Sequence, residues 1–150
     1  MRKKNIEKGY KGYVSSRPIL DNRVPQHIQN LVIRDYAKKN GIFYKLSAVE
    51  YAIEDSFLIL KHLVDQIQMY DGIILYTMFM LPGHKNERQQ IYKTVLKSNG
   101  SLHSAVEGFS LTKEEDIAKW ENVILTEQIC RDINYSEIED GIRRFCRKAT

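Results

Sequence analysis

The sequence lacks most of the features by which metal-binding and membrane proteins are recognised. It has 150 residues and only two cysteines, Cys130 and Cys146, which do not have the spacing of metal ligands. No two of the four histidines have such spacing either, so we expect no bound metal. No apolar run approaches the roughly 18 residues of a membrane span, and the basic start MRKKNIEKGYKGY is not followed by an apolar targeting segment. These absences predict a reduced, cytoplasmic protein without a membrane span.

Motifs that bind phosphate or activate a nucleophile are also missing. The sequence has no glycine-rich phosphate loop. The segment VSSRP lacks the flanking glycines of a nucleophile elbow. We therefore expect no cofactor, and an enzyme of this sequence would use acid-base or group-transfer chemistry.

The positive charge of the chain, +4 in total, lies at its two ends. Residues 1–11 carry five basic side chains and one acidic one, and residues 143–150 carry four basic ones, so the segment between them is acidic. A DNA-reading domain more often carries its basic residues on a folded face. DNA is therefore the weakest of the partners considered, and we expect the basic ends to be solvated.

Hydrophobic patterning predicts strands that alternate with helices along the chain. Short apolar or alternating runs predict strands at residues 11–16, 42–48, 71–80 and 101–108. Helical periodicity and end signals predict helices at 24–39, 57–70, 85–97 and 112–131, and a short helix at 136–148. Val24, Ile28, Leu31 and Val32 are the expected apolar stripe of the first helix, and Thr112 with Glu115 is an expected capping box.

This order predicts an α/β fold in which a four-stranded parallel sheet, with the strand order 2-1-3-4, has helices on both faces. The result is a three-layer sandwich of the flavodoxin type. We expect a single domain at residues 11–131, a basic tail at 1–10, and a short helix with a basic tail at 132–150. Ligands in such sheets bind beyond the carboxyl ends of the strands, here next to the first and third strands.

Polar residues follow these predicted strand ends. Ser15, Ser16 and Arg17 leave the first strand, and a guanidinium suits a phosphate or a carboxylate. The helix that begins near Pro25 and Gln26 points free backbone N–H groups at the same place. An anion bound there would meet both features.

Three polar residues of that helix, His27, Asn30 and Arg34, are spaced by three and four residues and share one face. Acidic residues follow two other strands. The resulting hypothesis has four catalytic candidates, His27, Glu107, Ser15 and Ser16, and six substrate-binding candidates, Arg17, Gln26, Asn30, Arg34, Glu50 and Tyr51. Plain structural roles, as turns, helix caps or surface ion pairs, remain open for all of them. His62 and His103 are expected to be structural.

Five segments resemble the small proteins found sporadically in bacterial carbohydrate-biosynthesis clusters: GYVSSRP, RVPQHIQNLVIRDYAKKNG, LSAVEYA, DGIILYTMFMLP and LHSAVEG. The resemblance spans roughly residues 10–125, and VPQHIQNLVIRDY is its most distinctive string. It implies a role in making or modifying a surface glycan such as the lipopolysaccharide O-antigen. The ligand would then be an anionic carbohydrate derivative, a sugar phosphate or a nucleotide sugar.

The order of elements is also similar to the catalytic domain of serine recombinases, the resolvases and invertases. In that family a Tyr-x-Arg-Val-Ser strand begins the domain, an Asp-Arg-Leu-x-Arg segment follows the third strand, and SAVEG here resembles a Ser-x-x-Glu segment. However, YVSSRP has no arginine two residues before its serines, and MFMLPGH lacks the Asp-Arg pair. Because those arginines stabilise the phosphoryl charge in DNA strand exchange, the resemblance implies a shared fold without that chemistry.

Three functions remain open from the sequence. The first is binding of the anionic carbohydrate derivative at the carboxyl edge of the sheet, with or without catalysis. The second is a non-catalytic dimeric adaptor for another enzyme of the pathway, in which two copies pair through the helix at 112–131. That helix has more apolar positions than one buried face needs: Ile117, Trp120, Val123, Ile124 and Leu125. The third is a resolvase-like DNA-binding protein.

Overall fold

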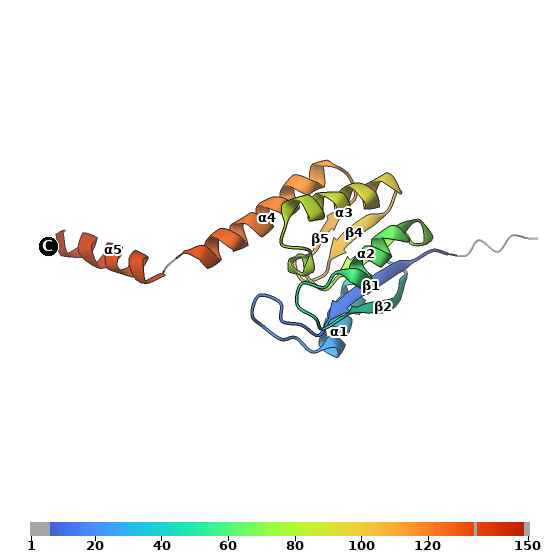
Figure 1. Cartoon of the computed structure of the whole chain (residues 1–150), viewed down its shortest axis with the longest axis horizontal. Helices are drawn as coiled ribbons and strands as arrows, with labels where there is room; N and C mark the ends of the chain where they lie inside the picture. The colour runs from blue at the N-terminus through green and yellow to red at the C-terminus, as the bar shows by residue number, and fades with distance from the viewer. Residues whose placement is uncertain (1–6, 134, 149–150) are drawn as a thin grey trace, which may run out of the picture. The chain divides into compact units, whose positions relative to one another are not determined.

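The computed structural model describes residues 7–133 and 135–148 (Figure 1). Residues 1–6 of the predicted basic tail lie outside the described residues. The strands are β1 (Tyr10–Ser15), β2 (Tyr44–Glu50), β3 (Gly72–Leu75), β4 (Ser101–Ser104) and β5 (Phe109–Leu111). The α-helices are α1 (Gln26–Lys39), α2 (Leu58–Asp65), α3 (Lys85–Lys97), α4 (Glu115–Asp132) and α5 (Tyr135–Lys148), and two short 3-10 helices are η1 (Ile67–Met69) and η2 (Met78–Met80).

Five strands form one mixed sheet in the order β2-β1-β3-β4-β5. The first four strands are parallel to their neighbours, and β5 is antiparallel to β4. This corrects the prediction of four parallel strands in the order 2-1-3-4. The predicted fourth strand at 101–108 ends at Ser104, and a turn ending at Gly108 (φ +67°) reverses the chain into β5. The hairpin was missed because its turn, AVEG, contains only one strong turn-forming residue.

The most apolar stretch of the chain is a strand over only part of its length. The predicted strand at 71–80 is β3 at Gly72–Leu75 followed by η2 at Met78–Met80. Met78 and Met80 are both buried. The apolar run therefore reflects burial of the whole segment, and hydrophobicity without alternation cannot separate a buried strand from a buried turn.

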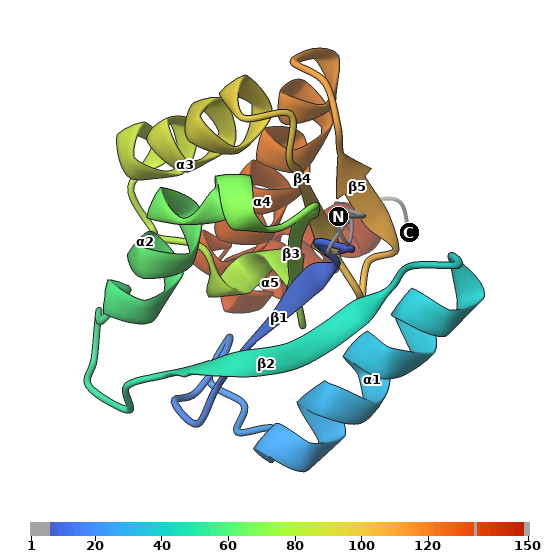
Figure 2. The ribbon, with the colours of Figure 1, turned by 90° about the vertical axis from the view of Figure 1, so that its right-hand side faces the viewer.

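Helices cover both faces of the sheet, with α1 on one side and α2 and α3 on the other (Figure 2). On the α1 face, Val14 and Ile74 pack against Ile33 and Ala37. Alternate strand residues point to the opposite face. The buried side of α1 is formed by Gln29, Ile33 and Ala37, whereas Ile28 and Leu31 of the predicted stripe are exposed.

The register of β2 against β1 contains a bulge. Tyr10 pairs with Tyr44 but Gly12 pairs with Ser47, so β2 has one extra residue between these pairs. The two strands also approach closely here, because a Cβ on Gly12 would lie 2.1 Å from Ser47 Oγ. The bulge turns Leu46 outward, and its side chain is 74 % exposed.

Asp116, in the first turn of α4, holds the segment that enters the helix, whereas the predicted pair was Thr112 with Glu115. Asp116 Oδ2 accepts hydrogen bonds from Thr112 N (2.9 Å), Thr112 Oγ1 (3.2 Å) and Lys113 N (3.2 Å). The Thr112 N–H is the main cause that lowers the pKa of Asp116. The capping-box pattern therefore identified the region where the helix starts but not the acidic residue that accepts a hydrogen bond from Thr112.

The chain divides into two compact units, one ending at Trp120 and one beginning at Glu121. In the first unit Trp120 is fully buried and its ring packs edge-on against Tyr92, with the ring centroids 6.2 Å apart. The second unit holds the remainder of α4 and α5, which is the short helix predicted at 136–148. Among the described residues no helix is both long enough and apolar enough to cross a membrane. The predicted domain boundaries at 11–131 and 132–150 stay predictions.

Candidate functional site

A crevice of about 240 Å³ lies at the carboxyl ends of β1, β3 and β4. We call it the strand-end crevice. Its lining comes from three loops: Ile19, Leu20, Asn22 and Val24 after β1, Tyr76, Thr77 and Phe79 after β3, and Val106 and Glu107 after β4. Parallel α/β sheets bind ligands at this edge. The lining is mainly apolar and aromatic, with one amide, the hydroxyls of Tyr76 and Thr77, and one carboxylate.

Glu107 is fixed in the crevice by hydrogen bonds from two strand ends. Its Oε1 accepts from the hydroxyl of Thr77, and its Oε2 accepts from the hydroxyl of Ser104 and from Met78 N (3.2 Å). These donors hold the carboxylate in one orientation. Of the predicted site residues, Glu107 is the one that lines the crevice.

The first wall of the crevice is a tight turn with an unusual backbone. Ile19 and Asn22 exchange two backbone hydrogen bonds, 2.8 and 3.0 Å long, and the residues between them have left-handed φ angles, +50° for Leu20 and +62° for Asp21. A left-handed conformation costs a residue with a side chain about 1 kcal/mol. Such backbone strain is often found at ligand sites. Here the strained turn places the Leu20 side chain in the lining of the crevice.

Gln29 holds the loop after β1 against α1. Its Oε1 accepts from Ser15 N (3.1 Å), and its Nε2 donates to Ser15 O (2.6 Å) and Val24 O (2.8 Å). Both Gln29 and Ser15 are fully buried, and the Ser15 hydroxyl accepts from Arg17 N (3.2 Å). The hydroxyl of Ser15, a predicted catalytic group, therefore lies inside the protein, while Ser16 next to it is exposed.

Arg17 joins two loops and does not line the crevice. Its guanidinium donates to the carbonyl oxygen of Ser56 and lies 4.5 Å from the ring centroid of Phe57. Phe57 precedes α2, in the loop after β2. The side chain predicted to bind the anion is thus already engaged by the protein.

Glu50 caps the N-terminus of α2 and is almost fully buried. Its carboxylate accepts from Leu60 N (3.1 Å), Ile59 N (3.1 and 3.3 Å), Tyr13 Oη (2.9 Å), Tyr51 N (3.0 Å) and Ser56 Oγ (3.1 Å). Burial acts to raise the pKa of Glu50, but these hydrogen bonds outweigh it and lower the pKa below its usual value. Burial, reinforced by the charge of Glu50, raises the pKa of Tyr13. The neighbouring Tyr51 is exposed.

The polar residues of α1 lie apart from the crevice lining. His27 is exposed and Gln26 half-buried. Asn30 accepts a 3.4 Å hydrogen bond from the Tyr44 hydroxyl. Further along the helix, Arg34 lines a second hollow, which we call the basic groove.

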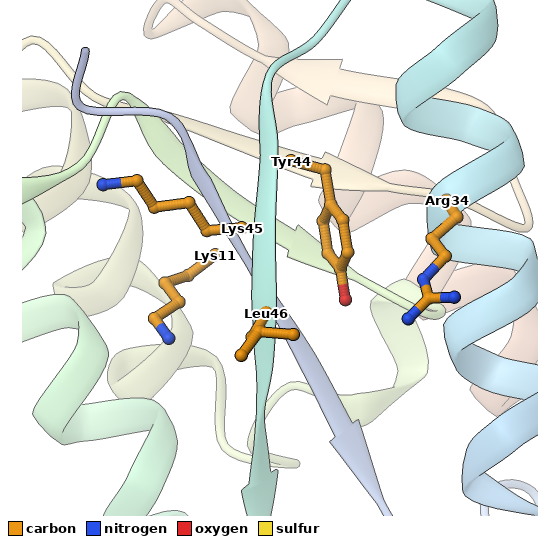
Figure 3. A pocket seen from close by; sticks show the side chains of 5 residues that line it. All are labelled: Lys11, Arg34, Tyr44, Lys45 and Leu46. Carbon is orange, nitrogen blue, oxygen red and sulfur yellow. The ribbon is translucent and has the colours of Figure 1, made fainter.

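The basic groove has a volume of about 560 Å³ and lies at the β2 edge of the sheet (Figure 3). It is lined by Lys11, Arg34, Tyr44, Lys45 and Leu46. The structure thus places three of the predicted residues apart from one another: Glu107 in the crevice, Glu50 at the start of α2 and Arg34 in the basic groove. Among the described residues no group of three His, Cys, Asp or Glu side chains could hold a metal ion.

Two residues that organise the crevice, Thr77 and Gln29, were absent from the predicted site. Thr77 is the one aliphatic hydroxyl in the largely apolar run YTMFM, and a polar residue in such a run is a signal that could have been followed. Gln29 lies four residues before Ile33, on the buried side of α1. Its burial could not be predicted from hydrophobic periodicity, because that pattern identifies buried positions by apolar residues and Gln29 is polar.

The fold is similar to that of a resolvase and of an integrase catalytic domain. It is similar to the crystal structure of a resolvase family site-specific recombinase from Streptococcus pneumoniae, with a TM-score of 0.57 and 10% identity over 92% of this chain and 99% of that one. It is also similar to the N-terminal catalytic domain of TP901-1 integrase, with a TM-score of 0.51 and 13% identity over 81% of this chain and 97% of that one. At such identities the likeness concerns the fold alone. No protein-family model and no curated protein matches the sequence.

Proposed function

We propose that this chain is a cytoplasmic, resolvase-fold protein that binds a carbohydrate derivative in the strand-end crevice. The lining of the crevice is the observation that carries the proposal. Tyr76 and Phe79 offer aromatic surface to the apolar face of a sugar ring, and Glu107 and Asn22 offer polar atoms to its hydroxyls. The resemblance to proteins of carbohydrate-biosynthesis clusters supports the same class of ligand.

The charge of the crevice decides which part of the ligand enters it. Among the described lining residues Glu107 is the one charged side chain, and an ionised carboxylate accepts hydrogen bonds from hydroxyls but repels an anion. The sugar ring therefore enters, and the phosphate of a sugar phosphate or nucleotide sugar stays outside. If the protein is an enzyme, Glu107 is its general base, since it is already oriented by Thr77 and Ser104.

Binding of free sugars, sugar phosphates and nucleotide sugars, followed by isothermal calorimetry and thermal shift, tests the proposal. We expect a stabilising ligand whose affinity falls at least about tenfold in Glu107→Gln, because the variant loses a charge-assisted acceptor. Phe79→Ala should weaken the same ligand by removing stacking surface. Glu114→Gln, at an exposed position outside the crevice, should not change the affinity. Absence of binding by all three ligand classes would contradict the proposal.

A second candidate is a homodimer that pairs through α4. Leu125 and Ile129 are each 53 % exposed on this helix, which favours a helix–helix contact with a second copy. Trp120, which the sequence placed on this surface, belongs to the core instead. Sedimentation velocity of the wild type and of Leu125→Glu tests the contact: a dimer that the variant disrupts supports it, and a wild-type monomer at all concentrations contradicts it.

A further inference from the structure

We propose that the β2 edge with its basic groove is a docking site for an acidic, extended segment of a partner protein. In the described structure β2 pairs with β1 along one side, and no strand pairs with its other side. An edge strand of this kind presents backbone N–H and C=O groups to which an extended peptide can add. The proposal concerns a surface separate from the strand-end crevice and does not depend on the ligand of that crevice.

The cations of the groove lie on both faces of the edge strand. Figure 3 shows Lys11 and Lys45 on one side of β2 and Arg34, with Tyr44, on the other. In the part of the chain that the structure describes, none of these three cations forms an ion pair. Among residues 7–133 and 135–148 no carboxylate lines the groove, so within this part of the chain its charge is not compensated locally.

This two-sided arrangement matches the geometry of an added strand. Successive side chains of a strand point to opposite faces of the sheet. Two consecutive acidic residues of an added segment therefore place one carboxylate near Lys45 and the next near Arg34. A single phosphate group reaches only one face at a time, so an extended acidic chain uses the cations better than a small anion does.

A second copy of this chain fits the same edge poorly. Pairing of β2 with β2 of another copy would bring the two sets of lysine and arginine side chains together, and like charges across an edge are a common device against such pairing. The charge of the groove thus selects a partner of opposite sign. This is why we assign the edge to a different, acidic chain.

Exposed apolar side chains in the groove and beside it define the rest of the partner segment. Leu46, at the bulge, and Val49 are 74 % and 45 % exposed. The bulge interrupts the ladder between Tyr44 and Ser47, so main-chain pairing is expected along the regular part of β2 that follows it. The segment should therefore combine acidic residues at the groove with β-branched residues opposite Val49.

A synthetic peptide of Glu-Glu-Val-Val repeats, fluorescently labelled and titrated with the full chain, tests the proposal. We expect binding that weakens as salt is added, because the contacts are exposed ion pairs. Lys45→Glu and Arg34→Glu, one from each face, should each weaken binding at least about tenfold. Lys97→Glu, the same change at an exposed site on α3, should not weaken it. Circular dichroism confirms that the variants fold.

Two further ligands separate strand addition from simple charge attraction. A peptide with the same sequence and alternate N-methylated residues keeps its carboxylates but loses its backbone donors, and we expect it to bind more weakly. Equal binding of both peptides, no binding of either, or equal weakening by Lys97→Glu would overturn the proposal. So would a single-stranded oligonucleotide of equal charge that binds more tightly and responds to the same variants, because the groove would then be a nucleic-acid site. Ligands of the crevice should bind Lys45→Glu normally.

Discussion

The side-chain amide of Gln29 pairs with the backbone of Ser15 through two hydrogen bonds, one to its N–H (3.1 Å) and one to its carbonyl oxygen (2.6 Å). A third bond, to Val24 O (2.8 Å), spans the loop between them. One buried side chain of α1 thus satisfies three backbone groups at both ends of the loop that forms the first wall of the crevice. The shape of the crevice depends on this contact.

Replacing Gln29 by methionine should therefore destabilise the protein and loosen that loop. The change keeps the size of the side chain but leaves three backbone groups without their partner, which costs roughly 3 kcal/mol in the free energy of unfolding. Urea denaturation measures the loss, and limited proteolysis between Arg17 and Arg23 measures the opening of the loop. Gln68→Met, at an exposed position, should change the free energy of unfolding by less than about 0.5 kcal/mol. A Gln29→Met protein as stable as the wild type would show that the contact is dispensable.

Leu20→Gly should leave the fold at least as stable as the wild type and weaken ligand binding in the crevice. Glycine adopts the φ of +50° without the cost of about 1 kcal/mol that leucine has there, although its greater freedom in the unfolded chain offsets part of the gain. The variant also removes an apolar side chain from the crevice lining. We expect a midpoint of urea unfolding no lower than that of the wild type and a reduced affinity for the crevice ligand.

Asp55→Gly provides the matched control, because Asp55 also has a positive φ (+54°) but does not line the crevice. It should relieve strain in the same way and leave ligand affinity unchanged. If both variants reduced affinity equally, the Leu20 side chain would have no specific role in the crevice.

Glu50→Gln should destabilise the protein by about 3 kcal/mol near neutral pH, because the amide replaces a charged acceptor of hydrogen bonds from α2 and Tyr13. The folded state lowers the pKa of Glu50 below its usual value of 4.5. The stability that its charge provides is thus present above pH 4.5 and is lost as the pH falls below that value. The difference between wild type and variant in urea unfolding should narrow over this acidic range. Glu54 is exposed in the loop between β2 and α2, and the Glu54→Gln variant should have the same free energy of unfolding as the wild type over this range.

A second loss of stability on acidification, which begins at a higher pH than that of Glu50, should come from His103. Burial lowers the pKa of His103 from 6.5 to about 4, and the ring contacts the hydroxyls of Tyr36 (2.8 Å to Nδ1) and Ser101 (3.0 Å to Nε2). Between these pH values the unfolded chain takes up a proton that the folded chain does not, so stability falls as the pH decreases from 6.5 to about 4. The loss should reach about 3 kcal/mol.

His103→Gln tests this assignment, because glutamine does not titrate and can still donate and accept a hydrogen bond. The free energy of unfolding of the variant should be nearly independent of pH between 6.5 and 4.5, where the wild type loses stability. A slope equal to that of the wild type would mean that other groups cause the pH dependence.

Local sequence signals predicted the elements well where the physical cause was itself local. The end of α1 is an example, because the lysines and glycine of KKNG act within the last turn and the helix ends at Lys39. The same local signals predicted the end of β3 less well, because the buried segment continues past the strand to Met78 and Met80 and is largely apolar. The hairpin to β5 was also missed because its cause is not local: the three residues of β5 form a strand by pairing with β4.

The candidate site divides in the same way. The sequence placed Glu107 after a strand, and a strand end in a parallel sheet lies at the ligand-binding edge whatever its neighbours are. It could not show that Arg17 binds the carbonyl oxygen of Ser56 or that Glu50 caps α2, because these partners are distant along the chain.

By itself the sequence determined an α/β chain with a mostly parallel sheet and polar groups at its carboxyl edge, because periodicity and end signals depend on neighbours a few residues apart. The tertiary structure alone decided which polar groups face a ligand and which bind the protein. That choice depends on contacts such as Arg17 with Ser56 and Gln29 with Ser15, which form only when separate loops are packed together. It also separated Arg34 from Glu107, because successive turns of α1 carry its residues away from the strand ends and toward the β2 edge.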